Sequence, residues 1–366
     1  MTRTADVVIV GGGVNGLSLA YNLAARQSIH DVAVFEAGYI GSKGTRLIDG
    51  EGGGVTLNQL PTSFFAQGTS LQTLVDNPFV GLIPYPTSTL AAAKVQRGQL
   101  LRPYPQYTGL GSFRKPQGNS IYHALTLRAD KRFSKGLSLL VAYTKGKLID
   151  DVSQTVNFLG PAGNKQDAYN RKAERAVSTQ DVAQRLVIGY VYELPFGKGK
   201  SLFGDAPTLV DKIIGGWQIN GITTFSSGTP LIITQSQNNA GIFSPGQRPN
   251  WTGVSAKLEG GSTTDRLARW FDTSQFTAAP AFTFGSAPRT MPDVRNPGLK
   301  LWDISFFKNM YFSEKKYNAQ FRVEMFGAFN TPQFNGPGAT VGNNNFGVIG
   351  GAGGARQIQL ALKLIM

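Results

Sequence analysis

Most of the chain alternates apolar and polar residues with a period of two, which is the pattern of β-strands whose two faces meet different surroundings. Residues 121–132 and residues 137–144 both alternate in this way, and Ser134, Lys135 and Gly136 form a turn signal between them. The two runs therefore predict a β-hairpin. Further alternating runs predict strands at residues 186–192, 217–225, 302–306, 320–325 and 357–366.

The predicted strands are about 9–12 residues long, carry one apolar and one polar face, and have aromatic residues near their ends. These features are typical of a transmembrane β-barrel, in which one face contacts lipid and the other faces a wet lumen. A soluble β-sandwich with one solvated face gives the same alternation, so the pattern alone leaves both architectures open. Strand length and the alternation of the last strand favour the barrel.

The N-terminal residues follow a different pattern. Residues 6–10 form a short, continuous apolar run, as in a buried parallel strand. Gly11, Gly13 and Gly16 follow in the spacing G-x-G-x-x-G, and residues 14–26 contain helix formers. This order of strand, glycines and helix is typical of a nucleotide-binding βαβ unit, in which the glycines let the backbone approach a pyrophosphate at the helix N-terminus.

A second β-like run, residues 32–35, ends at Glu36, which lies 20 positions after Gly16. In a dinucleotide-binding unit an acid at this position accepts hydrogen bonds from ribose hydroxyls. We therefore predict a dinucleotide-binding unit at the N-terminus, with a chance glycine-rich turn as the alternative.

The composition agrees with a β-rich chain that has many turns. Of the 366 residues 45 are glycine and 11% are aromatic, and only 16% are charged. Glycine costs about 1 kcal/mol in a helix interior, which disfavours a helical bundle. The chain has no cysteine, which excludes disulfides, iron–sulfur clusters and cysteine nucleophiles, and it has only 2 histidines. We predict no metal site.

The net charge of +14 favours contact with an anionic surface. We predict that six cations surround the turn of the predicted hairpin: Arg128, Lys131, Arg132, Lys135, Lys145 and Lys147. They could meet phosphate groups of lipid or of nucleic acid, but no nucleic-acid-binding module accompanies them. We interpret them as a solvated barrel rim and predict no nucleic-acid partner.

The remaining candidate residues are assigned structural roles. His30 is expected on the surface and His123 in the lumen or at an interface, and Asp150 and Asp151 are expected in a solvated loop. A lumen-side charge pair is expected between Arg322 and Glu324, which share one face of a strand. No G-x-S-x-G motif accompanies a plausible histidine, so no catalytic residue is predicted.

Two N-terminal stretches, DVVIVGGGVNGLSLAYNLA and VAVFEAGYIGS, resemble the N-terminus of the FAD-dependent D-amino-acid, glycine and sarcosine oxidase family over about residues 4–42. The resemblance implies FAD as a cofactor, bound through Gly11, Gly13, Gly16 and Glu36. It stops there, and no later segment resembles the substrate domain of that family. We therefore expect no bound cofactor unless this motif is functional on its own.

Several blocks farther along the chain carry a second resemblance: residues 38–47, 98–107, 118–125, 192–200, 215–221, 270–272, 326–330 and 347–354. They resemble outer-membrane TonB-dependent transporters of the Oar-like type, in collinear order over about residues 37–366. The resemblance implies an outer-membrane location, contact with membrane lipid and, in the full-length family, an inner-membrane energy-transducing partner. A full member also has a signal peptide, a plug and a barrel of about 22 strands.

This chain contains roughly half of those strands, and we identify neither a plug nor a signal peptide in it. We therefore predict mainly antiparallel up-and-down strands of a partial outer-membrane β-barrel, residues 43–366, preceded by a Rossmann-like βαβ fragment, residues 1–42. Residues 36–42 fit both families, so we interpret the chain as a hybrid, whether by natural fusion or by an assembly error.

The predicted function is that of a transporter-type barrel fragment without active transport of its own and without enzymatic activity. An amine-oxidising FAD-dependent oxidoreductase is the alternative, and a soluble β-rich binding protein is a third.

Overall fold

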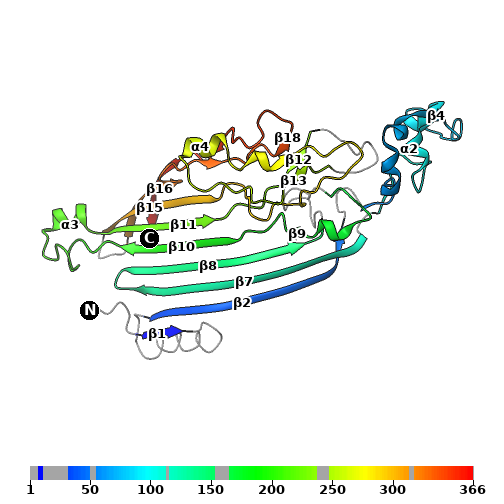
Figure 1. Ribbon diagram of the computed structural model, residues 1–366. Coiled ribbons are helices and arrows are strands. Elements are labelled where there is room, and N and C mark those ends of the chain that lie inside the picture. Colours follow the sequence, from blue (N-terminus) through cyan, green and yellow to red (C-terminus); the bar gives the residue numbers. More distant parts are fainter. Residues whose placement is uncertain are drawn as a thin grey trace.

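The computed structural model describes residues 7–10, 32–49, 55–112, 115–152, 165–236, 247–312 and 317–365. Its main feature is a 10-stranded sheet of long, curved strands (Figure 1). The strands of this sheet are β1 (Val7–Val10), β2 (Val32–Asp49), β7 (Lys115–Ser134), β8 (Leu137–Asp150), β9 (Ala176–Val177), β10 (Gln184–Glu193), β11 (Trp217–Ser226), β15 (Leu299–Phe312), β16 (Tyr317–Phe326) and β20 (Gln357–Ile365).

From β2 to β20 the long strands follow one another across the sheet in chain order, and every neighbouring pair is antiparallel. This is the predicted up-and-down arrangement. The predicted hairpin is confirmed as β7 and β8, joined by Lys135 and Gly136. Both turn residues have positive φ, 49° and 80°. Their left-handed conformation suits a two-residue hairpin turn, whose twist matches that of the strands.

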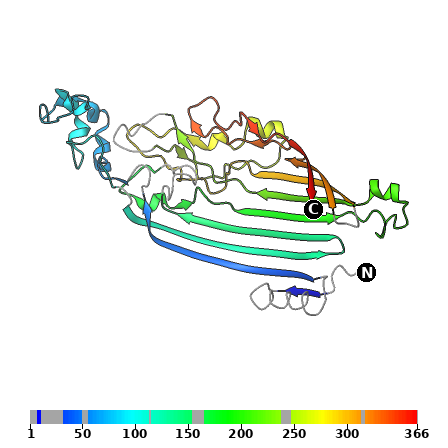
Figure 2. The same ribbon diagram turned by 180° about the vertical axis from the view of Figure 1, so that it is seen from behind.

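The connections between the strands differ in length at the two ends of the sheet. At one end, called the loop end below, long segments join the strands: residues 50–114, 151–183, 227–298 and 327–356. At the other end, the turn end, the connections are residues 135–136, 194–216 and 313–316. Figure 2 shows these two ends from behind, with the blue-to-cyan residues 55–112 beyond the loop end and the green connection 194–216 beyond the turn end.

The loop-end segments contain short strands and short helices. The strands are β3 (Val55–Thr56), β4 (Leu74–Asp76), β5 (Lys94–Gln96), β6 (Gly111–Ser112), β12 (Thr234–Gln235), β13 (Asn250–Trp251), β14 (Phe276–Thr277), β17 (Gln333–Phe334), β18 (Thr340–Val341) and β19 (Ala352–Gly353). The helices are the 3-10 turns η1 (Thr62–Gln72), η2 (Thr89–Ala91), η4 (Arg171–Glu174) and η6 (Thr273–Gln275), with α2 (Arg97–Leu100) and α4 (Thr263–Ala268). In contrast, α3 (Thr208–Ile214) lies at the turn end.

No described helix is both long and apolar enough to cross a membrane.

The buried core lies in the loop-end segments rather than between two layers of the sheet. One cluster is built around Phe271 and Ile233, both fully buried, and joins residues 227–298 to the segment that contains Phe346. A second cluster around Leu60 and Leu71 holds residues 55–112 together. We call the packed segments 227–298 and 327–356 the loop cap.

The sheet is open. Among the described residues, β20 pairs only with β16, and β2 is covered on its outer edge only where β1 pairs with it. The β1–β2 pair is parallel, with Val7 opposite Val32 and Val10 opposite Phe35. A parallel pair at these residues is part of the predicted βαβ unit, but residues 11–31 lie outside the described part, so the unit as a whole stays a prediction.

The predicted strand end at Glu36 is wrong. β2 continues without a break from Val32 to Asp49 and pairs with β7 along this length, with shifts in register only beyond Thr45. The strand therefore runs through residues 36–42, where the two sequence resemblances overlap, and through the boundary between residues 42 and 43. The physical reason is that residues 36–45 contain no proline, so each backbone N–H is available to extend the ladder with β7.

Candidate functional site

The sheet has one apolar face, which we define by the register of its strands. Its members share one side of the long strands, which we call the outward side: Leu125, Leu127, Leu139, Val141, Leu186, Ile188, Ile219, Phe225, Ile304, Phe306, Phe321, Val323, Leu360 and Leu362. Leu360 is 65% exposed and Leu362 is 66% exposed. Burying one such side chain away from water is favourable by about 1.5–3 kcal/mol, a gain that is lost if the face stays in water. This face is therefore suited to lipid.

Aromatic residues border the apolar face at both ends of the strands. Tyr192 and Trp217 lie toward the turn end, and Phe225 and Trp302 lie toward the loop end. The stretch from Trp217 to Phe225 is about 27 Å long at about 3.4 Å per residue. With a strand tilt of about 40° it covers roughly 20 Å, close to the apolar band of about 25 Å that outer-membrane barrels present between two aromatic girdles.

The acids of the long strands lie on one face of the sheet, whereas cations occur on both faces. The strand acids Glu36, Asp130, Asp150, Glu193, Asp303 and Glu324 all lie on the polar face, opposite to the apolar one. Asp49, beyond a register shift, is buried at the loop end. The charged residues on the apolar face are cations only, namely Lys43, Lys131, Lys145, Lys147, Lys300 and Lys308.

The polar face carries a hydrogen-bonded network near the C-terminus. Arg322 lies with its guanidinium 4.6 Å from the ring centroid of Phe307, and its Nε donates to Gln320 Oε1 at 2.6 Å. Gln320 in turn donates to Asn309 Oδ1 at 2.8 Å. Arg322 and Glu324 share this face as predicted, but Arg322 contacts Gln320 and Phe307 rather than Glu324. A face of this kind is suited to a wet lumen.

Buried ion pairs join the loop cap to residues 165–183, which lie between β8 and β10. Arg248 Nη2 lies 2.7 Å from Glu174 Oε1, and the two side chains are 1% and 2% exposed. Arg295 Nη2 lies 2.5 Å from Asp181 Oδ2. Removing one partner of such a pair leaves an uncompensated buried charge, so these contacts fix the loop cap on the segment between β8 and β10.

The expectation that Asp150 and Asp151 lie in a solvated loop is wrong. They are 7% and 8% exposed. Asp150 pairs with the buried Arg289, and Arg171 Nη2 lies 2.9 Å from Asp151 Oδ2. Asp150 is the last residue of β8 and Asp151 follows it, and segments distant in the sequence cover both acids there.

Electrostatics at the loop end follows from these contacts. Burial alone raises the pKa of Asp151, but hydrogen bonds from Asn119 and the charge of Arg171 outweigh it, so the pKa of this carboxyl lies below its usual range. Burial lowers the pKa of the Arg248 guanidinium, and Glu174 opposes that effect. Each buried cation in this network therefore depends on the acid beside it.

Two sequence blocks that carry the transporter resemblance meet inside the loop cap. Trp270 donates its backbone N–H to Gly347 O at 2.8 Å, and the rings of Phe271 and Phe346 pack edge to face at 5.2 Å. Hydrogen bonds from Gln275 and Ser274 lower the pKa of the neighbouring Asp272 to about 2. Residues 270–271 and 346–347 thus pack on each other, at the point where the two blocks meet.

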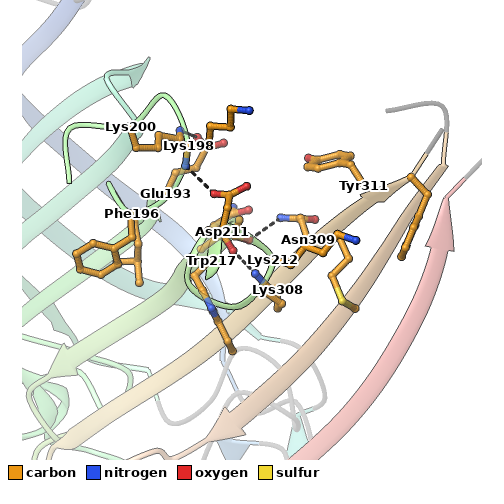
Figure 3. Close-up of a pocket in the computed structure, with 16 residues that line it drawn as sticks. Glu193, Phe196, Lys198, Lys200, Asp211, Lys212, Trp217, Lys308, Asn309 and Tyr311 are labelled. Atoms are coloured by element: carbon orange, nitrogen blue, oxygen red, sulfur yellow. Dashed lines mark hydrogen bonds and ion pairs between the residues drawn. The ribbon is translucent and has the colours of Figure 1, made fainter. Parts of the chain in front are cut away.

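A pocket of about 590 Å³ lies at the turn end, between residues 194–216 and the end of β15 (Figure 3). Lys200 Nζ lies 3.1 Å from Glu193 Oε2. Asp211 Oδ1 accepts a hydrogen bond from the backbone N–H of Lys198 at 2.6 Å. The two acids therefore already have partners within the connection, and the pocket is a consequence of how residues 194–216 fold back on β11.

Only one of the predicted cofactor-binding residues lies in the described part. Gly11, Gly13 and Gly16, like His30, lie outside it. Glu36 is exposed on the polar face of β2, opposite Arg128 of β7. His123 is also placed: it lies on the outward side of β7, where Tyr39 Oη is 2.5 Å from its Nδ1. No group of three or more potential metal ligands occurs within the described ranges.

Sequence reasoning missed the arginines of the loop cap. Arg248, Arg289 and Arg295 lie in residues 227–298, where no periodic pattern marks them. The only available signal was that an otherwise charge-poor chain places arginines in glycine- and proline-rich connections.

Comparison with known proteins gives one result. Residues 14–359 match the family model described as "Outer membrane beta barrel domain". Neither the curated proteins nor the solved structures contain a match to this chain. The family match agrees with the lipid-suited face and the up-and-down strands, and it supports a location in the outer membrane. Because the match covers most of the sequence, this chain belongs to the outer-membrane β-barrel domain family.

Proposed function

We propose that the chain is the distal part of a transporter-type barrel, of the TonB-dependent, Oar-like type. The observation that supports this most directly is the difference in length between the connections at the two ends of the sheet. Long segments lie at the loop end, and the two residues 135–136 suffice at the turn end. Outer-membrane barrels have long extracellular loops and short periplasmic turns, so the loop cap corresponds to the extracellular side.

The open edges of the sheet support a larger barrel. In a bilayer each unpaired backbone group costs several kcal/mol, so a spanning sheet has to close. Most of the outer edge of β2 and the free edge of β20 have no strand beside them among the described residues. Further strands are therefore needed to close the barrel, and barrels of about 22 strands are those of outer-membrane transporters.

The loop cap supports a transporter rather than a simple pore. Its aromatic cluster around Phe271 and its buried pair between Arg248 and Glu174 hold the described residues of this range, 227–236 and 247–298, in a fixed arrangement. An ordered extracellular cap is suited to retaining a ligand above the lumen. In the full-length protein, an inner-membrane partner would then supply the energy for its passage.

The arrangement of β2 does not fit a flavin-binding cleft. Such a cleft lies beyond the carboxyl ends of parallel strands, where the ribose-binding acid follows the strand end. Glu36 instead lies inside β2, in a ladder with β7. We therefore assign no flavin-binding role to Glu36 from its position in β2, and FAD binding stays a sequence prediction. A purified chain that is yellow, and that loses its colour when Gly13→Leu is introduced, would establish it.

The first test is sequencing of the source DNA across codons 30 to 50 and upstream. We expect the reading frame of the barrel to continue upstream into further alternating strands and a plug. A continuous gene with no barrel strands upstream would contradict the proposal.

The second test uses the chain itself in planar bilayers. An incomplete barrel is expected to give no steady conductance, whereas a stable open pore would show a small self-contained barrel and would also contradict the proposal.

A further inference from the structure

A group of four basic side chains lies on the outward side of β2, β7 and β8, near the loop end. His123 is directly opposite Lys147 in the ladder of β7 and β8. Lys145 and Lys43 are its diagonal neighbours, because they pair with Leu125 and Ile121. Directly opposed side chains have Cβ atoms about 5 Å apart and diagonal ones about 7–8 Å. The four cationic or basic groups therefore lie within reach of one ligand.

These side chains have no anionic partner in the described part of the chain. All four are exposed, and Lys43, Lys145 and Lys147 make no ion pair there. The acids of the long strands lie on the other face, as described above. Like charges at neighbouring sheet positions repel one another, so an external anion at this place would stabilise the folded sheet.

The position of the group relative to the membrane is set by the apolar face. Tyr143 lies just on the membrane side of it, opposite Leu127, and Tyr39 lies level with Lys145, since both pair with Leu125. The hydroxyl of Tyr39 holds His123, and the two rings stack with centroids 5.9 Å apart. Tyrosines favour the interface between hydrocarbon and headgroups, so the basic group beside these two tyrosines lies at headgroup level, at the loop end.

We propose that Lys43, His123, Lys145 and Lys147 bind the phosphate groups of a phosphorylated glycolipid in the outer leaflet of the membrane. The site continues the lipid-facing surface, so the acyl chains of such a lipid can lie on the apolar face below it. Several adjacent cations suit a headgroup that carries more than one phosphate, and lysines bind phosphates as point charges. The proposal rests on the family and on the orientation of the loop end, not on transport.

The experiment measures lipid binding to the purified full chain in detergent by native mass spectrometry. The probes are a bis-phosphorylated disaccharide glycolipid, its dephosphorylated form, and phosphatidylglycerol. The test variant is Lys43→Gln/Lys145→Gln/Lys147→Gln. The matched control is Arg185→Gln, because Arg185 lies beside Lys145 at the same level, opposite Thr144, but on the polar face. Circular dichroism and the unfolding midpoint show that both variants keep the fold.

We expect the phosphorylated glycolipid to bind the unmodified chain and the Arg185→Gln variant alike, and to bind the triple variant at least tenfold more weakly. Its binding should fall as salt is added, because exposed charges are screened. Equal binding of the dephosphorylated form, equal binding of phosphatidylglycerol, or an equal loss in the Arg185→Gln variant would each overturn the proposal. So would the absence of any binding to the unmodified chain.

Discussion

Arg289 and Asp150 form a fully buried pair although 139 positions separate them in the sequence. Arg289 Nη2 also donates to the backbone oxygen of Asp150 at 3.0 Å, and its Nε donates to Glu174 O at 2.8 Å. One guanidinium therefore links the loop cap to the end of β8 and to η4. The contact couples the arrangement of the loop cap to the strands of the sheet.

We expect Arg289→Met to destabilise the chain by about 3–5 kcal/mol, because it leaves Asp150 buried without a counter-charge. The measurement is the unfolding free energy in detergent, together with the rate of proteolysis within residues 227–298. Lys94→Gln is the control, since Lys94 and Asp76 form an exposed pair 3.8 Å apart. That variant should unfold like the unmodified chain. Equal effects of the two substitutions would show that burial of the pair is unimportant.

Asp151 should make the loop end sensitive to acid. Its pKa in the folded chain lies below that of an ordinary aspartate, so its contribution to stability is fully present above the pKa of the unfolded chain, about 3.9. The contribution is lost as the pH falls through the lower pKa of the folded state. Asn119 and Arg171 supply the contacts that are lost.

The measurement for Asp151 is the unfolding midpoint as a function of pH, compared with Asp151→Asn. The variant should be less stable at neutral pH, and the difference between the two should shrink as the pH falls below about 4. A constant difference at all pH values would contradict the assignment.

Sequence patterns predicted the long strands because each face of a strand meets one uniform environment. Leu125 and Leu127 recur at every second position for this reason, and the hairpin turn at Lys135 and Gly136 was also foreseeable. The length of β2 was harder to foresee, because Glu36 fits both the end of a short strand and the polar face of a long one.

The contacts within the loop cap could not be predicted from the sequence. Its contacts join segments far apart in the chain, and such contacts leave no local period. Asp150 and Asp151 illustrate the difficulty: two adjacent acids at a strand end usually indicate solvent, and only the placement of Arg289 and Arg171 makes their burial possible. The cations beside the β7–β8 hairpin were likewise grouped by sequence, whereas Lys145 and Lys147 lie far from the turn, near the loop end.

Gly216 should tolerate no side chain. Its φ is +69°, and a Cβ there would lie 2.5 Å from Asn309 O. Its own oxygen accepts the backbone N–H of Asn309 at 2.9 Å, so the chain cannot move away without losing that bond. Gly216→Ala is expected to cost about 1–3 kcal/mol.

The matched control for Gly216 is Gly189→Ala in β10, where nothing lies within 4 Å of the added Cβ. Unfolding in detergent should separate the two variants, with Gly189→Ala close to the unmodified chain. If the two substitutions lowered the free energy of unfolding by equally small amounts, the close approach of residue 216 to Asn309 O would not constrain the fold.

A pair of neighbouring residues in β10 tests which face meets lipid. Ile188 lies on the apolar face between Val141 and Thr223, and Val187 lies on the polar face between Ala142 and Thr224. Because a charge at the bilayer midplane is costly, Ile188→Arg should destabilise the chain in lipid by about 2–4 kcal/mol. Val187→Arg, facing a wet lumen, should have a much smaller effect. The measurement is the free energy of unfolding in lipid vesicles and, for comparison, in detergent micelles. The difference between the two variants should be smaller in micelles than in vesicles. A larger loss for Val187→Arg would reverse the assignment of the two faces.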